Sequence, residues 1–268
     1  MRALFLFLII VFAATPAPAQ GPGVASDRDV PDIARDVLFQ VSTIDALLDG
    51  VYDGAMPMAE VLAHGDTGIG TLDGLDGELI VIDGKAWVVR PDGRPAPVPG
   101  HVTTPFASVT PFEADQTLAL GPAVSMAELA AALDAALPTP NLFYAIKAHG
   151  EFKAVRTRSV PRQAKPYPPL AEVTAHQTVF ELGPVAGTLV GFYCPPYVKG
   201  VNVPGWHLHF LSDDRSSGGH VLDVAFDSLT VALDLTGEFF MALPPGDSDF
   251  YRSDLSLDRS KALHDVEK

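Results

Sequence analysis

Three histidines lie close together in the sequence, and their spacing suits a metal site. His207 and His209 are two residues apart in a run of apolar and aromatic residues, and His220 follows a polar Ser/Asp/Gly segment. On a β-strand, side chains two residues apart point to the same face. If residues 209 and 220 pair across a hairpin, all three imidazoles share that face. Three such ligands with one coordination position left open are typical of a catalytic divalent metal site.

The pattern leaves a plainer interpretation open, in which each histidine lies in the core or on the surface and makes an ordinary hydrogen bond. Two imidazoles with the same facing, and a third returned by a hairpin, favour the metal site. Cys194 is the only cysteine, which argues against a structural cysteine site and excludes an intrachain disulfide. The all-histidine set suits Zn²⁺, and iron, manganese, nickel and cobalt remain alternatives.

The composition is strongly acidic. The chain has 33 Asp and Glu against 18 Lys and Arg, a net charge of −15. Binding to a polyanion needs basic patches, so this charge disfavours nucleic acid and anionic membrane surfaces as partners. A small anionic substrate is compatible with it, provided that an arginine or a metal ion supplies local positive charge. The 268 residues are 47% hydrophobic, which is enough for a large core.

The N-terminus has the pattern of a secretory signal peptide. Arg2 precedes an apolar run over residues 3–14, and Ala-Pro-Ala ends at Ala19. We expect residues 1–19 to be cleaved, with an uncleaved anchor as the alternative. The run is short for a membrane span, which needs about 20 apolar residues. We therefore expect a secreted or periplasmic protein without stable membrane association, beginning with a loose segment over residues 20–36.

Strand patterns dominate the rest of the chain, so the fold class expected is β-rich α+β, with two mixed or antiparallel β-sheet regions and few short helices. Helices are expected at 44–48, in the tail from residue 256 or 258, and after a capping box that joins Ser125 to Glu128. Strands are expected at 37–41, 79–82, 86–89, 118–120, 178–182, 188–193, 224–233 and 238–243, the last two antiparallel.

Two further expectations concern the middle of the chain. A strand–turn–strand unit is expected about His149-Gly150, because apolar runs lie on both sides of this pair. The proline-rich segment 161–170 is expected to form a soft boundary between the two sheet regions.

Three charged residues are candidates for a catalytic or substrate-binding role beside the metal, although each also fits an exposed position. Glu78 leads into an apolar strand, and Arg158 lies in a segment that alternates polar and apolar residues. Glu267 is the penultimate residue, where disorder is the usual expectation. The pattern alone therefore selects none of them.

Several separate motifs resemble those of bacterial α-acetolactate decarboxylases, and they come in the same order. The likeness runs from about residue 37 to the C-terminus, which makes 37–268 a single catalytic domain of this kind. The motifs are 200–210 with Asp214, 218–220, 64–66, 68–71, 75–78, 157–161 and 165–167.

The resemblance implies a role for each candidate. The zinc ligands match His207, His209 and His220. The active-site glutamate matches Glu78, and the arginine that binds and orients the substrate matches Arg158. The remaining matches are Thr71 beside the substrate and Glu267, a C-terminal glutamate that folds back towards the metal. Trp206 departs from the family, which usually has a smaller aromatic residue there, and could reshape the pocket.

The implied reaction is the metal-dependent decarboxylation of (S)-2-acetolactate to (R)-acetoin and carbon dioxide through a metal-stabilised enediolate. Arg158 would hold the carboxylate, and Glu78 or Glu267 would supply the proton. The family's fold has two β-sheet regions with few helices, and a homodimer is common.

Two other classes of protein compete with this interpretation. A cupin-like metal dioxygenase also uses His-x-His on a strand, but it typically has a glutamate a few residues later, where this chain has Leu-Ser-Asp-Asp at 211–214. A secreted, non-catalytic binding module is the second alternative.

Overall fold

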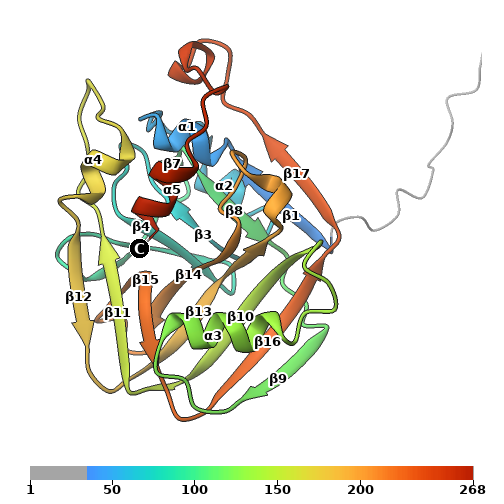
Figure 1. Cartoon of the computed structure of the whole chain (residues 1–268). Helices are drawn as coiled ribbons and strands as arrows, with labels where there is room; N and C mark the ends of the chain where they lie inside the picture. Colours follow the sequence, from blue (N-terminus) through green and yellow to red (C-terminus); the bar gives the residue numbers. More distant parts are fainter. Residues whose placement is uncertain (1–34, 268) are drawn as a thin grey trace, which may run out of the picture. The chain divides into compact units, whose positions relative to one another are not determined.

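The computed structural model describes residues 35–267, which form a β-rich fold (Figure 1). The predicted signal peptide, residues 1–19, and the segment 20–34 lie outside the described residues. Within the described part of the chain, no helix is long and apolar enough to cross a membrane.

The first sheet has seven strands in the order β17-β1-β8-β3-β4-β5-β6. All neighbours are antiparallel except β1 and β17, which are parallel. The strands are β1 (Val37–Val41), β3 (Thr67–Thr71), β4 (Glu78–Ile82), β5 (Lys85–Val89), β6 (Pro95–Pro97), β8 (Ala107–Thr110) and β17 (Glu238–Ala242).

The second sheet has eight antiparallel strands in the order β12-β11-β15-β14-β13-β10-β16-β9. A separate pair joins β2 (Met56–Pro57) to β7 (Thr103–Thr104). The strands of the second sheet are β9 (Gln116–Leu120), β10 (Phe143–Phe152), β11 (Ala154–Ser159), β12 (Thr178–Leu182), β13 (Val185–Cys194), β14 (Gly205–Ser212), β15 (Gly218–Ala225) and β16 (Leu229–Thr236).

The helices are short, as expected. The capping box that begins α3 is present: Ser125 Oγ accepts a hydrogen bond from the Glu128 N–H, and Glu128 Oε2 accepts one from the Val124 N–H. The helical segments are α1 (Ile44–Leu48), α2 (Met58–Val61), α3 (Met126–Asp134), α4 (Leu170–Thr174), α5 (Ser260–Val266), and the 3₁₀ turns η1 (Pro196–Val198) and η2 (Asp249–Arg252).

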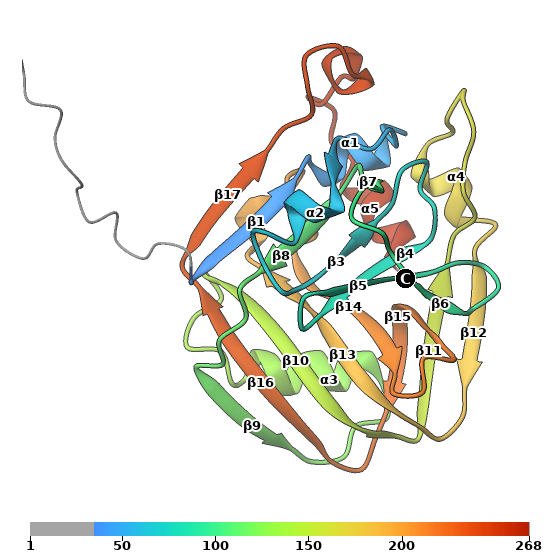
Figure 2. The ribbon, with the colours of Figure 1, turned by 180° about the vertical axis from the view of Figure 1, so that it is seen from behind.

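The two sheets pack against each other, with α3 on the outer face of the second sheet (Figure 1 and Figure 2). One apolar cluster draws buried residues from both sheets, and this burial is the main stabilising contribution to their packing. Its members include Leu38, Ile69, Ile80, Val190, Phe192 and Leu211. The inner strands β4 and β14 therefore lie face to face, and the histidines of β14 lie at this interface.

Three expectations need correction. β10 runs unbroken through His149 and Gly150, because both residues pair with β13. β17 was expected to be antiparallel, but it is parallel to β1. The prediction failed because the alternation of residues reports which side chains are buried and carries no information on strand direction. The chain passes between the sheets at 111–115 and again at Gly237, whereas 161–170 connects β11 to α4 and on to β12 of the same sheet.

Candidate metal centre and active site

The β14–β15 hairpin brings the three histidines together. His209 is paired with His220 across the hairpin, as the spacing predicted. One nitrogen from each of the three imidazoles lies within 4.8 Å of the others. Among residues 35–267 no other group of histidine, cysteine or acidic side chains has this arrangement.

Glycine at position 219 makes room for the neighbouring strand. Its φ is +129°, and a Cβ atom there would lie 2.5 Å from the carbonyl oxygen of Arg158. Without a side chain, β15 can approach β11 closely enough to pair His220 with Arg158. This close pairing of β15 with β11 places the guanidinium of Arg158 beside the imidazoles.

The nitrogen atoms of the histidines fit a bound divalent cation. His209 Nδ1 donates a hydrogen bond to the Leu79 carbonyl oxygen at 2.8 Å, which leaves the lone pair of its Nε2 free to bind a cation. The Nε2 atoms of His209 and His220 are buried without a hydrogen-bond partner. Buried polar atoms are rarely left unpaired, and coordination of a metal would satisfy both.

The protonation state of the imidazoles also fits. Burial, followed by the positive charge of Arg158, lowers the pKa of His207 to about 3. Burial likewise holds the pKa values of His209 and His220 well below the usual range. The three rings are therefore neutral at physiological pH, which is the form that binds metals.

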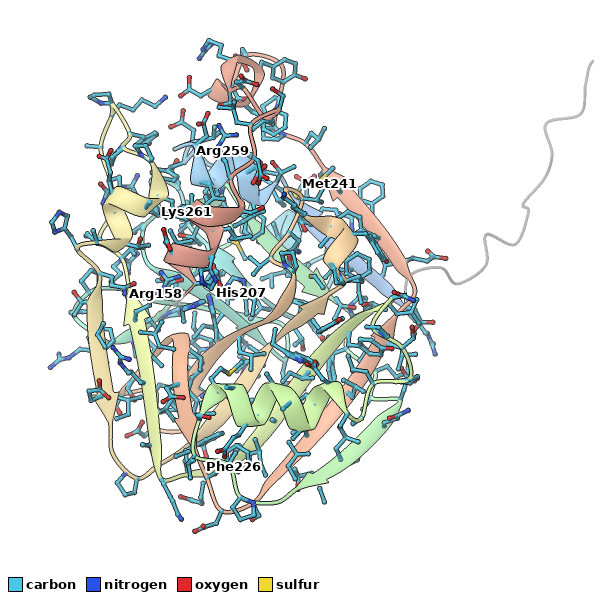
Figure 3. The ribbon with its side chains drawn as sticks, viewed as in Figure 1. Arg158, His207, Phe226, Met241, Arg259 and Lys261 are labelled. Carbon is cyan, nitrogen blue, oxygen red and sulfur yellow. The ribbon has the colours of Figure 1, made fainter. Side chains whose placement is uncertain are left out.

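Glu78 and Arg158 form a buried pair beside His209. Arg158 Nη1 lies 3.3 Å from Glu78 Oε1, and Glu78 Oε2 lies 3.7 Å from His209 Nε2. Figure 3 shows Arg158 and His207 next to each other beneath α5. Burial, opposed by Arg158 and reinforced by Glu267, raises the pKa of Glu78 to about 7. This carboxyl group can therefore hold a proton near neutral pH.

Glu267 reaches the same centre from the C-terminal end of α5. Its Oε2 lies 3.8 Å from the Nε2 atoms of both His207 and His220. The carbonyl oxygen of Val266 accepts a hydrogen bond from Arg158 Nη2 at 3.0 Å. Burial raises the pKa of Glu267 to about 7, against the lowering effect of Arg158.

A small cavity of about 40 Å³ connects these groups. Thr71 lies in its wall, paired with Glu78 across β3 and β4, and its hydroxyl donates to the Gly77 carbonyl oxygen. The polar lining consists of Thr71, Glu78, Arg158, His207, His209 and Glu267, and the apolar lining includes Ile44, Leu47, Leu75, Phe106, Val160 and Leu170.

The structure brings all predicted site residues together, and it adds an apolar wall that the sequence did not reveal. Ile44 and Leu47 come from α1, which was expected as a helix, and Leu170 comes from α4, which was not. Trp206 does not line the cavity. Its indole N–H donates to Asp134 of α3 at 2.8 Å, so it points away from the histidines.

Residues 38–257 match the family model for alpha-acetolactate decarboxylase. The chain belongs to this family. An alpha-acetolactate decarboxylase from Methanosarcina mazei is 54% identical over 242 residues, which cover 89% of this chain and 84% of the relative. Another from Bacillus subtilis is 41% identical over 230 residues, covering 86% of this chain and 89% of the relative.

A crystal structure of alpha-acetolactate decarboxylase from Bacillus subtilis strain 168 has the same fold. It superimposes with a TM-score of 0.83 and 40% sequence identity, over 86% of this chain and 99% of that chain. The β-rich fold is thus confirmed, and neither the cupin-like nor the non-catalytic alternative gains support. The family match ends at residue 257, so Glu267, which follows α5, lies outside it.

Proposed function

We propose that this protein decarboxylates (S)-2-acetolactate to (R)-acetoin and carbon dioxide, with a divalent metal held by His207, His209 and His220. Zinc is the metal that the all-histidine set favours. The observation that carries the proposal is the pair of buried, unpartnered Nε2 atoms on His209 and His220, beside one arginine and two acids. Family membership supports the substrate.

The metal would supply Lewis acidity at the three imidazoles, where the ketone and hydroxyl oxygens of the substrate would lie. Arg158 is suited to hold the substrate carboxylate. Its Nε is buried and unpartnered, so a donor remains for a ligand after the contacts to Glu78 and Val266. By holding the carboxylate, Arg158 would fix the orientation of the breaking carbon–carbon bond relative to the ketone.

Glu78 and Glu267 both lie beside the imidazole cluster, and each can serve as the acid. Burial raises the pKa of both carboxyl groups to about 7. A protonated carboxyl group next to the reacting carbon can deliver the proton that replaces carbon dioxide. If the proton comes from one side of the cavity, the product is a single enantiomer of acetoin.

The apolar wall suits the two methyl groups of the substrate. Ile44, Leu47, Leu170 and Phe106 line it. Contacts of Arg158 with a carboxylate are stronger beside such a low-dielectric wall than in open solvent.

The test is acetoin formation from racemic acetolactate by the purified protein, with metal analysis of the same sample. We expect one divalent ion per chain and a single enantiomer of acetoin. Bound metal without acetoin would contradict the substrate, and acetoin from metal-free protein would contradict the role of the histidines. Cleavage after Ala19, export from the cytoplasm and a homodimer stay predictions.

A further inference from the structure

The start of α5 is tied to the body of the protein by an ion pair between a largely buried arginine and a partly exposed aspartate. Arg259, which directly precedes α5, donates through Nη2 to Asp49 Oδ1 at 2.5 Å and through Nη1 to the Asp254 carbonyl oxygen at 2.8 Å. Its side chain is only 10% exposed. Asp49 is the C-terminal cap of α1, where a cation is also favoured by the helix dipole.

Two other ion pairs join the C-terminal segment to the body, but they are more exposed. They are Lys165 with Asp249 at 3.1 Å and Lys199 with Asp258 at 2.9 Å, and each lysine side chain is 54% exposed. Solvent-exposed pairs contribute little to stability. Among these three cations, Arg259 is the least exposed, and it is the one that lies at the start of α5.

The helix that follows depends on such anchoring. α5 has seven residues and no side-chain hydrogen bond at its N-cap, and a helix of this length is not stable alone in water. Its buried residues, Leu263 and Val266, pack in a cluster with Ile44 and Leu47 of α1. At its other end, the Val266 carbonyl oxygen accepts the hydrogen bond from Arg158.

We propose that Arg259 is a positioning residue for the active site. By holding the start of α5 against α1, it sets the place of the Glu267 carboxyl group and of the Val266 carbonyl oxygen that orients Arg158. The contacts described above are sufficient to infer that Arg259 holds α5 in place. The expected effect on turnover rests on the proposed function.

Lys261 offers a matched control on the same helix. It pairs with Asp265 one turn along α5, and its side chain is 92% exposed. Figure 3 shows Lys261 and Arg259 at the beginning of the helix, with Arg259 beside α1. Arg259→Ala and Lys261→Ala each remove one cation, but only the first breaks a contact between α5 and the body.

The experiment compares hydrogen exchange of residues 260–267 and steady-state kinetics in the full, metal-loaded protein. We expect Arg259→Ala to speed exchange in this segment about tenfold, the scale of one charge-assisted hydrogen bond. Exchange in the β14–β15 hairpin and the metal content should not change. The kcat should fall severalfold with a smaller change in KM, Arg259→Lys should restore part of it, and Lys261→Ala should match the wild type.

A double-mutant cycle with Asp49→Asn tests the contact itself. If the pair holds the helix, adding Asp49→Asn to Arg259→Ala should cause no further increase in exchange. Unchanged exchange in Arg259→Ala, or an equal effect of Lys261→Ala, would overturn the proposal. Faster exchange with an unchanged kcat would also overturn the positioning role. A wild-type protein that forms no acetoin would instead refute the proposed function, while the exchange data would still decide the docking.

Discussion

A single hydrogen bond shows how one residue is prepared as a ligand. His209 donates its Nδ1–H to the carbonyl oxygen of Leu79 on the facing sheet, which fixes both the ring orientation and the tautomer. The lone pair on Nε2 then points to the centre of the histidine cluster. Burial lowers the pKa of His209 well below its usual range, so the ring is neutral, the form that can bind a cation.

His209→Ala should therefore remove the metal. Two imidazoles would remain, and two ligands hold a divalent ion far more weakly than three. We expect metal content close to zero by elemental analysis, together with loss of acetoin formation. His149→Ala is the control, because His149 is an exposed histidine that pairs with Asp213 on the surface. Full metal content in His209→Ala would rule out this site.

Glu78→Gln should keep the metal and lose turnover. The amide has nearly the same size but cannot donate the proton of a carboxylic acid. We expect kcat to fall by roughly 10²–10⁴-fold with unchanged metal content. The exposed Glu151 on β10 provides the matched control as Glu151→Gln. Wild-type turnover in Glu78→Gln would remove this residue from the mechanism.

At the scale of elements, the sequence predicted what local pattern controls. The strand period and the polar turn were sufficient to pair His209 with His220, and the capping box was sufficient to place α3. Arg158 and Glu78 could not be selected in this way, because the two side chains that meet in the site are 80 residues apart in the sequence. The resemblance to a known family supplied them. The parallel pairing of β17 similarly depends on a long-range contact.

Gly219→Ala should disturb both the hairpin and the site. The backbone there has φ +129°, and the added methyl group would meet the carbonyl oxygen of Arg158. We expect a loss of about 1–3 kcal/mol in the free energy of unfolding, measured by denaturant titration, with reduced activity. A methyl group at Gly121 meets nothing within 4 Å, so Gly121→Ala is the control. Equal stability of the two variants would show that β15 and β11 do not need this close approach.

At the scale of the whole molecule, the site lies where two sheets and the C-terminal segment meet. Thr71 and Glu78 come from the first sheet, Arg158 and the histidines from the second, and Glu267 from the segment after α5. Metal binding should stabilise the folded state, since the three imidazoles of the β14–β15 hairpin converge only when the chain is folded.

The acidic charge also affects the whole molecule, through Asp234 on β16. This residue is fully buried, and burial reinforced by Asp115, Asp36 and Glu113 raises its pKa to about 7. The unfolded chain releases this proton near pH 4. The stability that Asp234 contributes is thus complete below about pH 4 and is lost as pH rises through about 7.

Asp234→Asn should accordingly be more stable than the wild type at pH 8, by about 1–3 kcal/mol, because it avoids a buried charge. The difference should shrink or reverse at pH 4. Denaturant unfolding at both pH values measures it, with the exposed Asp227→Asn as the control. A pH-independent difference would show that Asp234 does not titrate on folding.

The central claim is that a metal held by three imidazoles makes this chain an acetolactate decarboxylase. The most direct measurement is acetoin formation from racemic acetolactate before chelation, after complete removal of metal, and after return of one equivalent of Zn²⁺. We predict activity that disappears with the metal, returns with Zn²⁺, and consumes only the S enantiomer. Undiminished acetoin formation by metal-free protein, or none by the metal-loaded protein, would contradict the account.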